Sequence, residues 1–206
     1  LDFFDRAVSF CKRNEIAMLH DACYTEVAFD GYQPVSALQI PGSKDVCLEF
    51  HSLSKSYNMT GWRIGMAVGN ANLIRALFLV KSNLDSGVSQ AVQQMGIRAM
   101  ETPQSYLDER NAHYQRRRDK VIGALKGLGL NAEPPKASLY VWTPVPEGFT
   151  SASFATAILD DLDMVVTPGT GYGKYGEGYI RLSLTLSDED LEEGVRRLES
   201  WNVPKP

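Results

Sequence analysis

The chain has 206 residues, 44% of them hydrophobic and 22% charged, which is the composition of a globular protein and excludes a disordered or fibrous chain. No apolar run approaches the roughly 20 residues that a membrane helix needs. The formal net charge of −4 argues against a general affinity for nucleic acid or for anionic membranes. We interpret the one basic cluster, residues 116–118, as the solvated face of a charged helix.

The chain contains few residues that bind metals or form disulfides. Its three cysteines are odd in number and widely spaced, and it has only three histidines. We therefore expect neither a disulfide framework nor a metal site, and we expect a reducing, cytoplasmic setting. The chain shows no signal peptide and begins at Leu1 with what reads as a helix, so we interpret it as a piece of a longer protein.

The first half of the chain alternates between helical and apolar segments. Helical spacing of apolar residues and short apolar runs predict, in chain order, a helix over 2–14, strands over 16–20, 46–50 and 63–68, and helices over about 71–84 and 88–101. Mostly apolar strands between helices are typical of an α/β layer with a buried parallel or mixed sheet.

The second half begins at Thr102-Pro103 with a long charged helix over 104–128. The rest of the pattern predicts strands and helices in alternation, namely strands over 138–143, 164–167 and 179–186 and helices over 151–161 and 187–201. Ser187 followed by Asp190 predicts a capping box at the start of the last helix. We expect two domains, 1–103 and a smaller α+β domain over 104–206.

The most informative segment is SLSKSYNMTGWRIG at residues 52–65. Lys55 follows an apolar strand, and an open α/β sheet binds its ligands beyond the carboxyl ends of its strands. Hydroxyl groups at Ser52 and Ser54 and a guanidinium at Arg63 can together bind an anionic group. The first four residues by themselves fit an ordinary surface loop equally well.

The whole string closely resembles the cofactor-lysine signature of the class I/II (fold type I) pyridoxal-phosphate (PLP) aminotransferases. The resemblance implies that Lys55 carries PLP as an internal aldimine and that Ser52, Ser54 and Arg63 hold its phosphate. It also implies that residues 1–103 are the C-terminal part of the PLP-binding large domain, a mostly parallel sheet with helices. Residues 104–206 are then the small C-terminal domain, and the protein is a homodimer.

Asp21 and Tyr24 resemble a second element of this family, D-x-x-Y. An aspartate at a strand end is by itself more often a turn residue. The resemblance implies that the Asp21 carboxylate keeps the pyridine nitrogen of PLP protonated, since an opposite charge nearby favours the charged form. Tyr24 then hydrogen-bonds the ring oxygen O3′.

Arg181 lies in the sequence GEGYIRLS, which resembles the small-domain element G-x-G-Y-x-R of the same family. The resemblance implies that Arg181 binds the α-carboxylate of the substrate through paired hydrogen bonds. The alternative is an ordinary exposed arginine on a strand. Residues 135–142 resemble a small-domain strand of the branch that handles diaminopimelate, aspartate or alanine, and we assign Lys136 and Ser138 no catalytic role.

The resemblance implies transfer of an amino group from an LL-diaminopimelate, aspartate or alanine type donor to a 2-oxo acid such as 2-oxoglutarate, with Lys55 as general base and acid. Two alternatives stay open: a PLP-dependent carbon–sulfur β-lyase, and a non-catalytic sensor domain of a transcription regulator. The phosphate loop, ring-stacking aromatic and asparagine segment of the family's N-terminal half are not in this sequence. We therefore expect the chain alone to hold the cofactor poorly.

Overall fold

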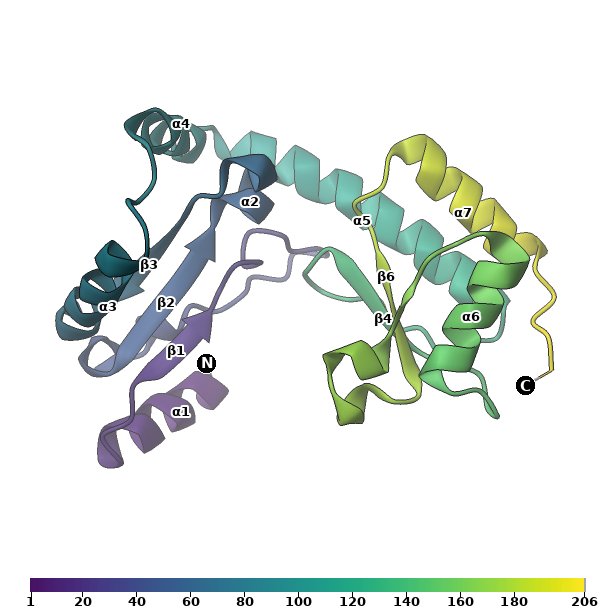
Figure 1. Cartoon of the computed structure of the whole chain (residues 1–206), viewed down its shortest axis with the longest axis horizontal. Coiled ribbons are helices and arrows are strands. Elements are labelled where there is room, and N and C mark those ends of the chain that lie inside the picture. Colours follow the sequence, from purple (N-terminus) through teal and green to yellow (C-terminus); the bar gives the residue numbers. More distant parts are fainter. Residues whose placement is uncertain (206) are drawn as a thin grey trace. The chain divides into compact units, whose positions relative to one another are not determined.

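The computed structural model describes residues 1–205, which form two compact units (Figure 1). The first unit is Leu1–Glu109 and the second begins at Arg110. Helix α5 (Gln104–Gly127) starts where the sequence places the domain boundary and contributes residues to both units. The assignment of 1–103 and 104–206 to a large and a small domain stays a prediction. No helix in the described part of the chain is both long and apolar enough to cross a membrane.

The first unit is a three-stranded sheet with helices. Its elements are α1 (Asp2–Arg13), β1 (Met18–Asp21), β2 (Cys47–Ser52), α2 (Leu53–Ser56), β3 (Gly65–Gly69), α3 (Ala71–Leu84) and α4 (Gln90–Met100). The strand order is β1-β2-β3, with β1 parallel and β3 antiparallel to β2, so the sheet is mixed. Helix α1 lies beside β1 and α3 beside β3 (Figure 1).

This topology brings three chain segments to one edge of the sheet. Because β1 and β2 are parallel, their carboxyl ends at Asp21 and Ser52 lie at the same edge. The antiparallel strand β3 begins at that edge, with Gly65 opposite Ser52. A Cβ atom on Gly65 would lie 2.6 Å from the carbonyl oxygen of His51, so only glycine allows the two strands to approach this closely here.

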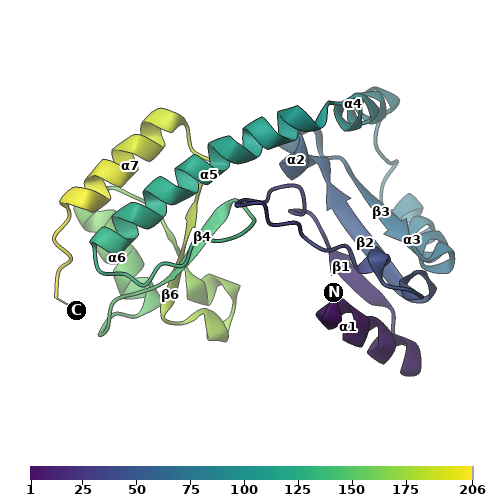
Figure 2. The same cartoon turned by 180° about the vertical axis from the view of Figure 1, so that it is seen from behind.

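The second unit packs three helices on one face of an antiparallel sheet. Besides α5 it contains β4 (Tyr140–Pro144), α6 (Ser151–Leu162), β5 (Thr167–Pro168), β6 (Tyr179–Ser183) and α7 (Asp188–Ser200). The strand order is β4-β6-β5. Val141, Ile180 and Leu182 join the core with residues of α5, α6 and α7. Figure 2 shows α5 crossing in front of this sheet. Side chains alternate along strands, so Tyr140, Trp142, Tyr179 and Arg181 occupy the other face.

The predicted elements are found, with differences at some boundaries. The strand predicted over 164–167 is only Thr167–Pro168, and the one predicted over 179–186 ends at Ser183. The predicted capping box of α7 is half formed. The Ser187 hydroxyl accepts from the Asp190 N–H, but the Asp190 carboxylate bonds this hydroxyl rather than the Ser187 backbone, because aspartate is one methylene shorter than glutamate.

The interpretation of residues 116–118 as a solvated face is wrong for two of the three arginines. Arg116 is exposed, but Arg118 is only 3% exposed and donates hydrogen bonds to Asp119 and to the carbonyl oxygen of Pro135. Arg117 bonds Asp188 and the carbonyl oxygen of Leu184. A run of charged residues in a sequence does not establish that their side chains are exposed. An arginine can bury its aliphatic stem when carboxylates and carbonyl groups accept hydrogen bonds from its guanidinium.

Candidate cofactor and substrate site

The predicted cofactor residues all belong to the first unit and lie around the sheet edge where β1 and β2 end. Asp21 is the last residue of β1, and Tyr24 follows it in a turn. Ser52 is the last residue of β2, and Lys55 lies in α2 directly after it. The Nζ atom of Lys55 is 5.7 Å from the centre of the Tyr24 ring. The short distance between the two follows from the parallel pairing of β1 with β2.

Helix α2, which carries Lys55, is held at its start by two hydrogen bonds. The Ser52 hydroxyl accepts from the N–H of Ser54 at 3.3 Å and so caps the helix start. Leu53 is buried, and its N–H donates to the carbonyl oxygen of Ile64 at 3.2 Å. The helix is therefore fixed to the start of β3, and the half-buried Lys55 projects from a fixed backbone.

Ser54 and Arg63 form a polar contact beside Lys55. Arg63 Nη1 donates to the Ser54 hydroxyl at 3.4 Å and to the carbonyl oxygen of Thr60 at 2.9 Å. Ser54 is 5% exposed, whereas Arg63 is exposed, so the guanidinium keeps donors toward solvent. Arg63 has a left-handed backbone with φ of 52°, which is uncommon for a residue with a side chain and is found most often at functional sites. A hydroxyl and a guanidinium in contact can bind an anion together.

The pKa of the Cys23 thiol depends on two opposite charges at this edge. Burial, a hydrogen bond with Asp21 and the negative charge of Asp21 raise the pKa of the Cys23 thiol to about 11, and the positive charge of Lys55 acts in the opposite direction. Asp21 also accepts from the Cys23 N–H at 3.3 Å. A carboxylate and an ammonium group therefore both act on one thiol, which stays protonated at neutral pH and is a poor nucleophile.

The sequence analysis missed a buried carboxylate on β2. Glu49 is 2% exposed, and His20 Nδ1 and His51 Nε2 each lie 2.8 Å from one of its oxygens. The Ser36 hydroxyl and the N–H of Ala37 donate to the same carboxylate. We call these residues the Glu49 network. Burial raises the pKa of Glu49, but the hydrogen bonds from Ser36, His20 and His51 outweigh it and lower the pKa below its ordinary value.

The Glu49 network connects β1 and β2 close to the strand ends where the candidate site lies. His20 precedes Asp21 on β1, and His51 precedes Ser52 on β2. His20 lies opposite Glu49 in the strand register. The one signal in the sequence was an acidic residue within an apolar strand run. An acid in such a position needs a buried partner.

Arg181 lies in the second unit, on the central strand β6 between Trp142 of β4 and Thr167 of β5. It is half-buried, and its Cζ atom lies 4.0 Å from the centre of the Tyr140 ring and 4.5 Å from that of the Tyr172 ring. Arg181 is thus held by aromatic rings on the sheet face that does not contact the core.

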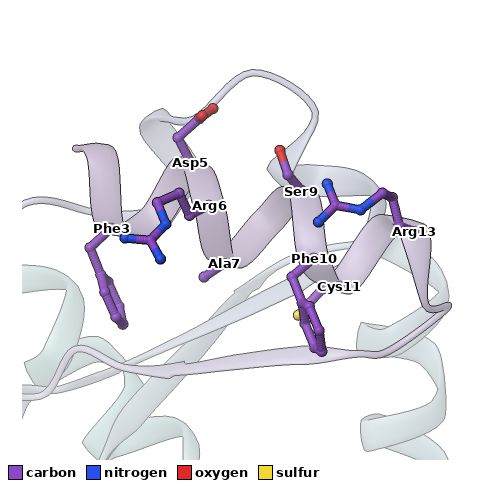
Figure 3. A pocket seen from close by; sticks show the side chains of 8 residues that line it. All are labelled: Phe3, Asp5, Arg6, Ala7, Ser9, Phe10, Cys11 and Arg13. Atoms are coloured by element: carbon purple, nitrogen blue, oxygen red, sulfur yellow. The ribbon is translucent and has the colours of Figure 1, made fainter.

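Figure 3 shows a hollow that lies along α1 and contains none of the predicted site residues. Its lining residues all come from that one helix, and they are Phe3, Asp5, Arg6, Ala7, Ser9, Phe10, Cys11 and Arg13. A surface hollow along a single helix lacks the convergent groups of a binding site. Among residues 1–205, no group of three or more His, Cys, Asp or Glu side chains is arranged to hold a metal ion.

Comparison with known proteins places this geometry in a family. The sequence profile of the family described as "Aminotransferase class I and II" matches residues 2–198. The structure matches substrate-bound BacF from Bacillus subtilis with a TM-score of 0.91 and 34% identity, over 98% of this chain and 52% of that chain. It also matches a probable N-succinyldiaminopimelate aminotransferase from Thermus thermophilus with a TM-score of 0.88 and 32% identity, over 96% and 53%.

Curated relatives agree with this result. An "LL-diaminopimelate aminotransferase" of Dehalococcoides mccartyi is 59% identical over 201 residues, which cover 98% of this chain and 52% of that protein. An "LL-diaminopimelate aminotransferase 2" of Trichormus variabilis is 53% identical over 203 residues, with the same two coverages of 98% and 52%. The chain therefore spans about half the length of the curated relatives it matches. Over nearly all of its own length, the chain belongs to the class I and II aminotransferases.

Proposed function

We propose that the whole protein is a PLP-dependent aminotransferase that moves an amino group from an amino acid to a 2-oxo acid such as 2-oxoglutarate. The name of the 59% identical relative favours LL-diaminopimelate as the donor, with aspartate and alanine as related candidates. The observation that carries the proposal is the placement of Lys55 at the sheet edge beside Tyr24, next to the contact between Ser54 and Arg63.

The residues at this edge fit PLP in charge and in hydrogen bonding. Its phosphate is an anion that needs donors, and the hydroxyls of Ser52 and Ser54 with the guanidinium of Arg63 supply them. Its protonated pyridine nitrogen is a cation that a nearby negative charge stabilises, and Asp21 is an exposed carboxylate at the end of β1. When bound, PLP supplies an electron sink for the carbanion that forms at the substrate α-carbon.

Each of these residues has a separate role in the proposed reaction. Arg63, Ser52 and Ser54 fix the phosphate and so orient the ring. Asp21 holds the proton on the pyridine nitrogen, and Tyr24 donates a hydrogen bond to the ring oxygen. The amine of Lys55 takes the proton from the substrate α-carbon as general base and would return it as general acid to the C4′ atom of the cofactor. Arg181 binds the α-carboxylate through paired hydrogen bonds.

The decisive experiment replaces Lys55 in the whole protein. Lys55→Ala should lower turnover by about 10²–10⁴-fold or more, because the general base is removed. Borohydride reduction of the PLP-loaded wild-type protein should attach PLP to the peptide that contains Lys55, as found by mass spectrometry. Lys44→Ala, which removes an exposed lysine of the same unit, is the control and should change neither result.

Full activity of Lys55→Ala, or PLP attached to a different lysine, would overturn the proposal. The same preparation separates the lyase alternative from transamination. A lyase releases pyruvate from cystathionine with no 2-oxo acid present, whereas the aminotransferase needs the acceptor for repeated turnover.

The family resemblance supports a homodimer, since members of the family are usually dimers. The three free cysteines support a reducing, cytoplasmic location. Sedimentation equilibrium of the whole protein should give a mass of two chains. Cell fractionation should place the protein with the cytoplasmic markers. A monomeric mass with full activity would overturn the dimer.

A further inference from the structure

The environment of Arg181 differs from that of Arg117 and Arg118, which are half-buried and buried arginines of the same unit. Arg117 pairs with Asp188 and Arg118 with Asp119. Arg181 takes part in no ion pair within residues 1–205. Its guanidinium instead lies within 4.5 Å of the ring centres of Tyr140 and Tyr172, well inside the 6 Å range of a cation–π contact.

Aromatic rings hold a guanidinium in a way that suits a carboxylate ligand. A carboxylate from the protein would occupy the N–H groups of Arg181, neutralise its charge and compete with a bound anion. A ring attracts the cation through its electron-rich face and supplies no carboxylate oxygen. The N–H groups, which all lie in the guanidinium plane, are then left to form a bidentate pair with a ligand.

The sheet and the loop that precedes it fix the two rings. Tyr140 lies on β4, one strand away from Arg181 and on the same face. Tyr172 lies in the loop before β6, and its ring packs edge-on against Trp142 with ring centres 5.8 Å apart. Trp142 is directly opposite Arg181 and stacks on Tyr179 at 5.5 Å. Each ring is thus supported by the sheet rather than by the ligand.

We propose that Tyr140 and Tyr172 are positioning residues that hold the guanidinium of Arg181 for the α-carboxylate of the substrate. The inference rests on the proposed function, in which Arg181 binds that carboxylate. It extends the proposed function by naming the contacts that fix the arginine. Because every amino acid and every 2-oxo acid carries the same carboxylate, the two tyrosines strengthen binding of all substrates equally and do not select among side chains.

The experiment uses the PLP-loaded whole protein with Tyr140→Leu, Tyr172→Leu and the matching Tyr→Phe variants. Loss of one ring should raise the KM of donor and acceptor by about 2- to 30-fold, with kcat little changed. The dissociation constant of 2-methylaspartate, which has no α-proton and does not react, should rise by a similar factor. The phenylalanine variants keep a ring and should weaken binding less than the leucine variants do. Tyr175→Leu, in the same loop and 89% exposed, is the matched control.

Arg181→Ala separates failure of this inference from failure of the proposed function. If Arg181→Ala abolishes binding of 2-methylaspartate but both leucine variants bind normally, the role of the rings is wrong and the proposed function stands. If Arg181→Ala binds normally, the carboxylate site itself is wrong. A leucine variant that lowers kcat and leaves KM unchanged would also overturn the inference, as would unequal effects on different donors.

Discussion

The two units hold Arg63 and Arg181, the arginines proposed to bind anions, by different means. In the first unit, Arg63 is held by hydrogen bonds to Thr60 and Ser54, and the neighbouring strand ends are joined by the buried carboxylate of Glu49. In the second unit, Arg181 is held by the rings of Tyr140 and Tyr172. Hydrogen bonds hold a guanidinium but use its N–H donors, whereas rings hold it through its charge and leave those donors available for a ligand.

The largest effect on stability should come from Glu49 in the first unit. Glu49→Ala removes the acceptor that His20, His51, Ser36 and the N–H of Ala37 share, and it leaves those polar groups buried without a partner. Breaking a buried charged network by removing one member costs about 3–5 kcal/mol. Urea denaturation followed by circular dichroism should therefore show a free energy of unfolding lower by about this amount.

Glu101→Ala provides the matched control for Glu49→Ala. Glu101 pairs with Arg98 on the surface of α4, where both side chains are largely exposed. Exposed pairs contribute little, so this variant should unfold with wild-type midpoints. An equal decrease in the free energy of unfolding in Glu49→Ala and Glu101→Ala would mean that the Glu49 network does not stabilise the strand ends. The proposed difference between the two units would then be wrong.

A smaller effect is expected where the second unit fixes the loop that carries Tyr172. A Cβ atom on Gly169 would lie 2.0 Å from the carbonyl oxygen of Gly176 and 2.8 Å from that of Tyr179. Gly169→Ala must therefore displace backbone, at a cost of about 1–3 kcal/mol in the free energy of unfolding. Because the loop moves, binding of 2-methylaspartate in the whole protein should weaken as it does in Tyr172→Leu.

Gly171→Ala tests whether that loss comes from the close backbone contact. The added methyl group would meet only Thr167 Cγ2, at an ordinary distance of 3.7 Å. Its free energy of unfolding should stay within about 0.5 kcal/mol of wild type. A Gly169→Ala protein that is as stable and binds as tightly as Gly171→Ala would show that the loop is not fixed by this contact.

The sequence predicted the parts of the fold that depend on local pattern and on simple sheet geometry. The apolar pattern of residues 71–84 predicted α3 with the bounds that the structure has, and the α/β fold class is confirmed. Asp21 and Lys55 were each predicted to follow an apolar strand, and the family resemblance assigned both to one cofactor. The parallel pairing of β1 with β2 brings the two strand ends to one edge.

The missed features depend on contacts between distant segments. Glu49 was seen only as one residue of an apolar run, because its partner His20 is known only once the register of β1 on β2 is known. Tyr172 was seen only as part of a glycine-rich loop, and no spacing rule links it to Arg181. The burial of Arg118 depends in the same way on a carbonyl group of Pro135 in a later loop. Sequence patterns describe one element at a time and do not give these pairings.

The smallest expected effect is a difference in acid response between the two units. The pKa of Glu49 is lowered in the folded protein from its ordinary value of 4.5, because hydrogen bonds from Ser36, His20 and His51 outweigh burial. A carboxyl group with a lowered folded pKa stabilises the fold fully above its unfolded pKa. This contribution is lost as the pH falls through the folded value. The difference in free energy of unfolding between wild type and Glu49→Gln should therefore narrow as the pH falls below about 4.5.

Tyr172→Leu should behave differently in the same titration. The contact between Arg181 and its rings contains no carboxyl group, so the difference between wild type and Tyr172→Leu should stay constant from about pH 7 to pH 3.5. Comparing each variant with wild type at every pH cancels the acid response of other carboxylates such as Asp188, whose pKa is also lowered, chiefly by Arg117. A Glu49→Gln difference that widens on acidification would mean that the folded protein favours the protonated carboxyl. The hydrogen bonds of the Glu49 network would then not depend on an ionised Glu49 carboxylate. The Glu49 network and the aromatic environment of Arg181 would then differ only in geometry.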